Sequence, residues 1–428
     1  SSSKVLHRGT YQGVIEKIPY LKELGVNQIQ CMPIYEFDEC AKTKINYWGY
    51  GPAFYFAPKE AYSSDGCAVR ELKDMVKACH KADIEVVLEM PFAAGISEQE
   101  AAECLRFYMM EYHVDGFVVN PYIVSWELLN KDPFLKGIRL MRKDDGFQNV
   151  MLLFLKGDEN MLGEFAAISR KNETNSASIN YIANNNGFTL NDLVSYDRKH
   201  NELNGENNRD GEDFNFSWNC GEEGSTRKRK IKELRMRQIK NALAFVFLSA
   251  GTPLILAGDE FGNSQNGNNN PYCVDSELSW VNWKESKEGK EILEWTKALI
   301  QFRQNNKILH MPQSLTLSDR VSCGYPDISY HGTNAWYAQM NTYDRHLGIM
   351  YSCVYGDEED HSLIYAAYNM HWENHSFALP KINGTWKVDM SSNVSGAVID
   401  DNNRSVCVEP RSVAILTGTY EIPAKKEK

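Results

Sequence analysis

The hydrophobic pattern of residues 1–310 alternates between a helical period and short continuous apolar runs. The helical period predicts helices at residues 13–24, 71–82, 98–112, 229–249 and 290–306. The apolar runs, two of them stopped by Pro33 and Pro91, predict strands at residues 26–32, 85–90, 116–119, 138–141, 179–183 and 253–257. A further apolar run at residues 149–155 has no assigned element. Because helices and strands alternate, the pattern predicts a parallel sheet with helices outside it, closed into a (β/α)8 barrel of the TIM type.

Beyond residue 310 the pattern changes to a period of two. Short strands are predicted at residues 363–368, 376–379, 386–388 and 413–416, with turn residues between them. This pattern predicts an all-β domain, most simply a β-sandwich. We therefore expect two domains, a barrel at residues 1–310 and a β-sandwich at residues 311–428.

Composition narrows the class of partner. The chain has 428 residues, of which 43% are hydrophobic and 24% are charged, and its formal net charge is −11. A negative chain is a poor ligand for nucleic acid or an anionic membrane, whereas a neutral polymer such as a glucan is compatible with it. The ten cysteines show no CxxC pair, which predicts reduced thiols rather than a zinc site or a disulfide framework. We expect no metal and no other cofactor. We find neither an apolar run of the ~18 residues that a membrane span needs nor a signal peptide, so the expected location is the cytoplasm.

Residues 181–220 are the stretch most typical of a binding site. A strand-like run ends at three asparagines and Gly187, and a short helical piece follows, with Thr189 or Asn191 as its predicted cap. The next segment is a long polar loop that contains Phe214, Phe216 and Trp218. Long loops within compact chains are functional or disordered, and aromatic residues favour an ordered loop. We therefore expect functional side chains where this strand ends.

Several long motifs resemble glycoside hydrolase family 13, the alpha-amylase superfamily, in its isoamylase and glycogen-debranching branch. They are YIANNNGFTLNDLVSYDRKHNELNGENNRDGEDFNFSWNC at 181–220, NYWGYGP at 46–52, AGDEFG at 257–262, GNNN at 267–270, SWVNW at 279–283, PDISYH at 326–331 and the pair Trp336-Tyr337. The resemblance covers nearly the whole chain. It implies a (β/α)8 barrel with a C-terminal β-domain and a function with α-glucans such as glycogen or starch.

The same resemblance implies that the catalytic residues are degenerate. Retaining glycoside hydrolysis needs two carboxyl groups about 5 Å apart, one as nucleophile and one as acid, and the family adds a third that stabilises the transition state. Motif by motif, Asn120 takes the nucleophile slot, Lys143 the general-acid slot, Asn186 the stabiliser slot and Val118 the slot of a conserved arginine. An amide has no anionic oxygen with which to attack an anomeric carbon. The resemblance also implies tentative sugar contacts at Tyr47, Trp48, Tyr50 and Asn185.

The cleft itself is expected to be incomplete. The family's third strand ends in an Asn-His pair, which Ala93-Ala94 replaces here, and a long loop domain normally follows. This chain runs from Gly95 directly into the helix predicted at 98–112, so that loop domain is missing. The family's first barrel strand lies just upstream of the segment that resembles residues 1–5. Either this chain is a fragment that lacks this strand, or the barrel is incomplete or closes differently.

Three functions remain open at this point. The first is a catalytically inactive relative that binds glucan or acts as a scaffold, either with an active debranching enzyme or by self-association. The second is an active α-1,6-glucan debranching hydrolase whose acid and base have moved. Candidate carboxylates for it are Glu89, Asp115, Asp144, Asp145, Glu164, Asp259 and Glu260. The third is a structural subunit that binds no sugar. His200, His331 and the Asn-rich loops at 204–211 and 263–270 are expected to be structural.

Overall fold

A parallel sheet of six strands forms the centre of the first part of the chain. The computed structural model describes residues 5–40, 43–172, 177–284 and 286–420. The strands follow the order β1 (Gln28–Cys31), β4 (Glu85–Glu89), β5 (Gly116–Val118), β6 (Arg139–Lys143), β7 (Ala177–Asn180) and β8 (Thr252–Pro253). Within the described residues β1 pairs only with β4, and β8 only with β7. The predicted parallel sheet is confirmed as an incomplete barrel, open between its first and last strands. Residues 1–4 of the segment where we expected the first strand to be missing lie outside the described residues.

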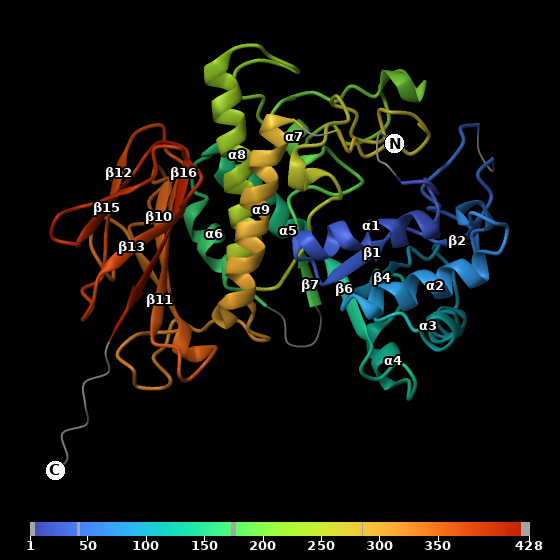
Figure 1. The fold of residues 1–428 in the computed structure, drawn as a ribbon, viewed down its shortest axis with the longest axis horizontal. Coiled ribbons are helices and arrows are strands. Elements are labelled where there is room, and N and C mark those ends of the chain that lie inside the picture. The colour runs from blue at the N-terminus through green and yellow to red at the C-terminus, as the bar shows by residue number, and fades with distance from the viewer. Residues whose placement is uncertain (1–4, 41–42, 173–176, 285, 421–428) are drawn as a thin grey trace.

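Helices cover the outside of this sheet (Figure 1). Their bounds are α1 (Tyr11–Leu24), α2 (Ala68–Lys81), α3 (Glu98–Tyr112), α4 (Trp126–Lys131), α5 (Asp145–Lys156), α6 (Leu162–Ser169), α7 (Leu190–Leu193), α8 (Arg229–Leu248) and α9 (Lys287–Asn305). Capping accounts for several ends: Thr10 and Ser97 each accept a backbone N–H at the start of α1 and α3, and Gly25 ends α1 in the left-handed region. The five predicted helices are confirmed, and Thr189 is the cap of α7. The unassigned run at 149–155 belongs to α5.

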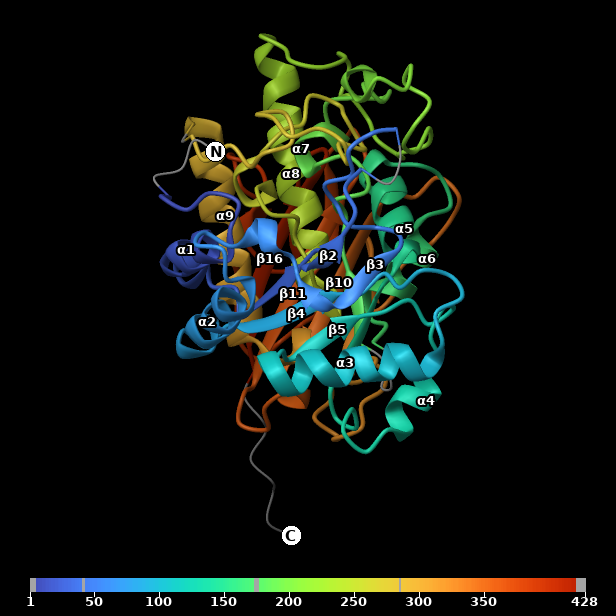
Figure 2. The ribbon, with the colours of Figure 1, turned by 90° about the vertical axis from the view of Figure 1, so that its right-hand side faces the viewer.

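One strand prediction needs correction, and one hairpin was not predicted. The predicted strand at 253–257 is wrong beyond Pro253, because β8 contains only Thr252 and Pro253. Among the described strands β8 pairs only with β7, and the chain turns away at Gly258, which has a φ of 102°. Sequence patterning also missed the hairpin of β2 (Tyr35–Phe37) and β3 (Ala53–Pro58). In Figure 2 this hairpin lies above α3. The connection from β4 to α3 spans only residues 90–97, so no loop domain intervenes.

The last part of the chain is a β-sandwich. One sheet has the order β13 (Trp386–Ser391), β16 (Ser412–Thr419), β11 (Ser362–Asn369), β10 (His346–Ser352) and β9 (Ile328–His331). The other has the order β12 (His375–Ala378), β15 (Ser405–Val408) and β14 (Val398–Ile399). All described pairings in both sheets are antiparallel. The predicted all-β domain is thus confirmed.

The larger sheet of the sandwich is buried on both faces. Along β11, Leu363, Tyr365 and Ala367 pack into the sandwich interior. The residues between them, Ile364, Ala366 and Tyr368, belong instead to the core cluster that contains α5, α6, α8 and α9. Side chains of a strand alternate between the two faces of a sheet, so a strand covered on both sides reads as a continuous apolar run. This shared core joins the two parts, and the boundary at residue 310 stays a prediction.

Arginines bind the end of α5 where it meets the sandwich. Arg411 donates from Nη1 to the carbonyl of Lys156 at 2.6 Å, and Arg345 donates from Nε to the carbonyl of Gly157 at 2.5 Å. The last carbonyls of a helix have no partner within it, so these guanidinium groups complete the helix end. Gly157 has a φ of 85°, and a Cβ atom there would lie 2.5 Å from Nη1 of Arg411. No helix in the described ranges is long and apolar enough to cross a membrane.

Gly157→Ala should therefore destabilise the chain. The added methyl group forces a left-handed backbone on alanine and displaces Arg411, and we expect a loss of about 1–3 kcal/mol. Gly163→Ala is the matched control, because Gly163 lies in α6 and a Cβ atom there would have no neighbour within 4 Å. We expect that control to be neutral or more stable by less than about 1 kcal/mol. Urea unfolding followed by circular dichroism measures both; equal stability of the two variants would contradict the role of this junction.

Candidate functional site

The inner face of the open barrel is built from alternate residues of its strands. Its middle layer is apolar and contains Val87, Val118, Met141, Ile179 and Tyr181, all buried. On β4 and β6 the residues two positions away are charged: Glu85 and Glu89 flank Val87, and Arg139 and Lys143 flank Met141. This alternation places polar layers below and above the apolar layer, as expected for side chains that point into a barrel.

The lower layer lies toward the N-terminal ends of the strands. Gln28 donates from Nε2 to Oε2 of Glu85 at 2.9 Å, and Arg139 pairs with the same carboxylate. Glu85 and Arg139 are on β4 and β6, with β5 between them. The guanidinium group can cross β5 because Gly116 faces Arg139 and has no side chain in its path.

The upper layer repeats this arrangement at the C-terminal ends of the strands. Nζ of Lys143 lies 3.1 Å from Oε1 of Glu89, and Gln30 donates to Oε2 of Glu89 at 3.3 Å. The Tyr50 hydroxyl donates to Oε1 of Glu89 at 3.2 Å and accepts from Nδ2 of Asn185 at 2.8 Å. Lys143 also donates to Oδ1 of Asn185 at 3.4 Å. Gln30, Lys143 and Tyr50, from three separate segments, therefore converge on the Glu89 carboxylate. Asn185 joins the network through Lys143 and Tyr50.

Burial strengthens this network. The side chains of Glu89 and Lys143 are only 11% and 19% exposed. Burial, together with the nearby charge of Glu89, raises the pKa of Tyr50, so its hydroxyl stays protonated and donates. Glu89 thus has donors on both oxygens, and the charge of Lys143 is compensated. Sequence reasoning named Glu89 only as a spare carboxylate and missed Gln30; the polar residues at alternate positions of β1 were the available signal.

The predicted slot residues lie around this network. Lys143 ends β6 and joins it directly, and Val118 lies in the apolar layer beneath it. Asn120 and Asn186 are both exposed. Asn120 accepts the backbone N–H of Tyr122 at 2.9 Å, so its amide oxygen stabilises its own turn. Asn186 follows Asn185 on the loop after β7, and its backbone N–H donates to Asn184.

The tentative sugar contacts form an aromatic surface beside the upper layer. Tyr47, Trp48 and Tyr50 are half-buried. The ring of Trp48 lies 5.9 Å from that of Tyr50 and 6.4 Å from that of Tyr272, both edge to face. Tyr272, which sequence reasoning missed, also accepts the backbone N–H of Tyr47 at 2.9 Å. Aromatic rings next to hydrogen-bonding groups can stack on sugar rings. Because Tyr50 belongs to both sets, the aromatic surface and the ion pair form one site.

The other candidate carboxylates are engaged in structure. Asp115 precedes β5 at the opposite end of the sheet, where it accepts from the backbone of Val86 at 2.7 Å. Asp144 caps α5, and Asp145 accepts from Tyr181. Glu164 lies in α6.

The carboxylates that follow β8 are buried supports for the loops. Asp259 accepts the backbone N–H of Leu190 at 2.9 Å, and Glu260 accepts from Tyr20 at 2.7 Å. Burial, with the charges of Glu260 and Asp192, raises the pKa of Asp259 well above its ordinary value. Since Leu190 begins α7 just after the Asn185 loop, Asp259 helps to hold the functional loop in place.

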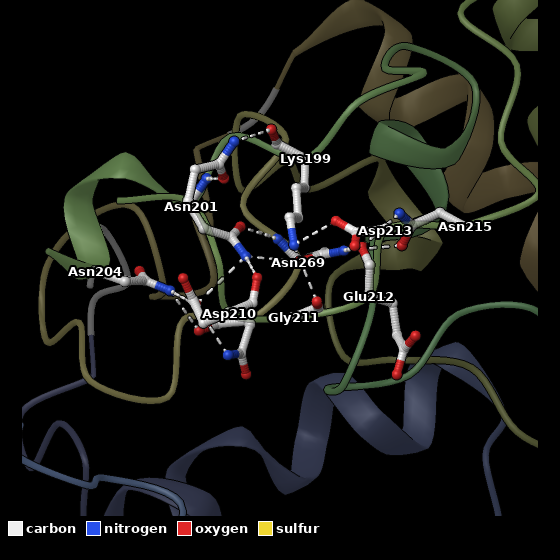
Figure 3. A network of polar contacts seen from close by, with 11 residues as sticks. Lys199, Asn201, Asn204, Asp210, Gly211, Glu212, Asp213, Asn215 and Asn269 are labelled. Atoms are coloured by element: carbon white, nitrogen blue, oxygen red, sulfur yellow. Dashed lines mark hydrogen bonds and ion pairs between the residues drawn. The ribbon is translucent and has the colours of Figure 1, made fainter. Parts of the chain in front are cut away.

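Buried asparagines of the two Asn-rich loops form hydrogen bonds that join one loop to the other (Figure 3). Asn201 donates to Oδ1 of Asn269 at 2.8 Å and accepts its backbone N–H at 3.0 Å. Asn204 donates to Asp210 at 2.6 Å, and Lys199 bridges to the carbonyl of Gly211 at 3.1 Å. Asn201, Asn204 and Asn269 are buried. The prediction that these loops are structural agrees with this network.

The two predicted structural histidines lie away from the ion pair. His200 lies 3.4 Å from Glu223 and packs against Tyr196. His331 is fully buried in the sandwich, and burial lowers its pKa to about 3. No group of three or more His, Cys, Asp or Glu residues among those described has the arrangement to bind a metal ion.

The chain combines an incomplete parallel barrel with a β-sandwich. Polar groups lie at the C-terminal ends of the barrel strands, as in enzymes and binding proteins built on (β/α)8 barrels. A protein-family profile for the alpha-amylase catalytic domain matches residues 1–102. Over 398 residues the chain is 33% identical to a GlgX homologue, a glycogen operon protein, of Mycobacterium tuberculosis, covering 70% of this chain and 55% of that protein. It is 30% identical to chloroplastic isoamylase 1 of Arabidopsis thaliana, covering 71% and 54%.

Solved structures agree on the fold. A pullulanase from Bacillus acidopullulyticus superimposes with a TM-score of 0.71 at 19% identity, covering 97% of this chain and 58% of that one. A pullulanase from Paenibacillus barengoltzii, in complex with maltohexaose and alpha-cyclodextrin, has a TM-score of 0.73 at 16% identity, covering 98% and 75%. The chain belongs to the alpha-amylase superfamily, glycoside hydrolase family 13, in its isoamylase and glycogen-debranching branch. It spans about half the length of the curated relatives it matches.

Asp259→Asn should change how stability depends on pH. Because the pKa of Asp259 is raised, the folded chain binds more protons than the unfolded chain between the ordinary value of about 3.9 and the raised value. Wild-type stability attributable to this group therefore falls as pH rises through that window. The amide preserves the contact with Leu190 and does not ionise, so the variant should gain stability relative to wild type between about pH 4.5 and about pH 7.5. The urea midpoints of wild type and variant at both pH values measure the difference in stability. Asp401→Asn is the control, because Asp401 lies in an exposed turn. A stability difference that is the same at both pH values would contradict a raised pKa of Asp259.

Proposed function

We propose that this chain binds α-glucan in the debranching branch of its family and does not hydrolyse it. The observation that carries the proposal is the contact between Lys143 and Glu89, at 3.1 Å. The ammonium group compensates the Glu89 carboxylate, which has donors on both oxygens. Retaining hydrolysis needs a free carboxylate and a carboxylic acid about 5 Å apart. The amides of Asn120 and Asn186, which the family motifs align with two of its carboxylates, supply neither.

Glucan as the ligand is supported by the aromatic surface and by the relatives. Tyr47, Trp48, Tyr50 and Tyr272 offer half-exposed rings beside the amide of Asn185. The relatives are named for glycogen and for isoamylase, and a structural neighbour is a pullulanase with bound maltohexaose. Sugars bind where aromatic rings stack on them and a few placed polar groups bind their hydroxyls. An active debranching enzyme as partner and a location in the cytoplasm stay predictions.

The active-hydrolase alternative depends on Glu89. It is a carboxylate at a strand end of the barrel, which is where a catalytic group would lie. If it acted as acid or nucleophile, Glu89→Gln would abolish turnover, whereas the proposal expects no turnover to lose. The purely structural alternative differs instead in expecting no glucan binding.

The test combines turnover with binding. We expect no reducing sugar from glycogen or pullulan at high protein concentration, either for wild type or for Glu89→Gln. In affinity electrophoresis through glycogen we expect wild type to be retarded. Trp48→Ala removes one stacking ring and should weaken binding about fivefold to tenfold, as expected for about 1–1.5 kcal/mol of stacking.

Two controls make the outcome decisive. Tyr343→Ala removes a 71% exposed ring outside the site and should migrate like wild type. The triple variant Asn120→Asp, Lys143→Glu, Asn186→Asp shows whether the remaining cleft can support catalysis; we expect it to stay inactive because the family's loop domain is missing. Turnover by wild type that Glu89→Gln abolishes would establish the hydrolase instead, and wild type that is not retarded would favour the structural subunit.

A further inference from the structure

A second exposed aromatic pair lies on the sandwich, in the connection between β9 and β10. Trp336 is 49% exposed and Tyr337 is 58% exposed. Trp336 has a φ of 65°, in the left-handed region. A bulky side chain rarely adopts this conformation, so the surrounding structure must impose it.

The buried side chain of His331 holds Trp336 in this backbone conformation. The backbone N–H of Trp336 donates to Nδ1 of His331 at 2.8 Å, and Nε2 of His331 lies 2.8 Å from the hydroxyl of Ser329. Because Nδ1 accepts, Nε2 has the proton and donates to Ser329. Burial lowers the pKa of His331 to about 3, which keeps the ring neutral and Nδ1 able to accept. The N–H of Gly332 also donates to the carbonyl of Tyr337 at 2.9 Å. A buried anchor thus fixes an indole at the surface.

The neighbouring loop extends this surface. The ring of Tyr325 stacks on Trp336, with centroids 6.1 Å apart and planes at 26°. Tyr355 donates to the carbonyl of Tyr325 at 3.0 Å and lies 2.9 Å from Asp319, and the Arg320 guanidinium lies 5.6 Å above its ring. Asp319 and Arg320 are exposed. Tyr355 therefore links the segment of the stacked Tyr325 ring to a carboxylate and a guanidinium group.

We infer that Trp336, Tyr337 and Tyr325 form a second α-glucan-binding surface, on the β-sandwich rather than on the rim of the open barrel. A glucose ring would stack on the exposed face of Trp336, with its hydroxyls toward Asp319 and Arg320. The class of ligand rests on the proposed function, whereas the place and the residues do not.

The chemistry of the border favours a neutral sugar over other ligands. A lasting protein interface buries about 800 Å² on each partner and is apolar at its centre, and a surface of three rings offers much less. The opposite charges of Asp319 and Arg320, and the net charge of −11, do not favour a polyanion. A sugar is apolar on its ring faces and polar at its rim. It therefore binds to aromatic rings that have hydrogen-bonding groups beside them.

The test is calorimetric titration of the whole chain with β-cyclodextrin and with maltoheptaose. Trp336→Asn removes the indole, and asparagine accepts a positive φ, so the loop is expected to remain folded. Trp48→Ala reports on the barrel site, and Tyr343→Ala is the control ring on the same connection. We expect two sites in wild type. Trp336→Asn should weaken one about fivefold to tenfold and leave the other unchanged; Trp48→Ala should do the reverse, and Tyr337→Ala should act like Trp336→Asn.

The outcomes separate the two claims. If wild type binds and Trp336→Asn, with an unchanged thermal midpoint, binds equally well, the second surface is refuted and the barrel site stands. If binding disappears in Trp336→Asn but survives Trp48→Ala unchanged, the second surface stands and the barrel proposal fails. Absence of binding by wild type to either sugar overturns both.

Discussion

The ion pair of Lys143 and Glu89 is the contact on which the inner face of the open barrel depends. It joins β4 to β6 across β5, and it is possible because β5 presents Val118 rather than a longer side chain beneath the ammonium group. Both charges are largely out of water. Removing one partner of such a pair leaves an uncompensated charge, which costs about 3–5 kcal/mol in buried examples. Tyr50 and Asn185 are positioned by this pair, so the pair determines both the electrostatics of the site and the geometry of its aromatic wall.

The supports of the site extend through the whole fold. Lys143 ends β6, and α5 begins two residues later at Asp145. The far end of α5 meets the β-sandwich, where Arg411 and Arg345 complete its last carbonyls. The loop that contains Asn185 leads into α7, which Asp259 holds by the N–H of Leu190. The sandwich therefore supports β6, which ends at Lys143, through its contacts with α5. It also contains the exposed aromatic surface around Trp336.

Much of the fold followed from local patterning, because its helices have regular apolar faces and clear caps. The helix at 98–112 was predicted with its observed bounds, and the structure shows that Ser97 caps its start. α2 begins earlier than its apolar spacing indicated, and β8 is shorter than its apolar run, because pairing at a sheet edge ends where no neighbour continues. The hairpin of β2 and β3 depends on tertiary packing that periodicity does not encode.

The site was predicted only in outline. Lys143, Tyr50 and Asn185 were named from family motifs, and the structure brings them together. Their common partner Glu89 was one of several candidate carboxylates, because a sequence alone does not say which side chains meet across an intervening strand. Gln30 and Tyr272 were missed for the same reason. The alignment of Asn120, Lys143 and Asn186 with the family's catalytic slots stays a prediction.

A crystal structure of the chain with bound maltoheptaose would show directly whether the site around Lys143 and Glu89 binds glucan without cleaving it. We expect an intact oligosaccharide against Trp48 and Tyr50, with Nζ of Lys143 still in contact with Glu89. Cleaved sugar, or a Glu89 carboxylate that has left Lys143 and lies against an anomeric carbon, would contradict it.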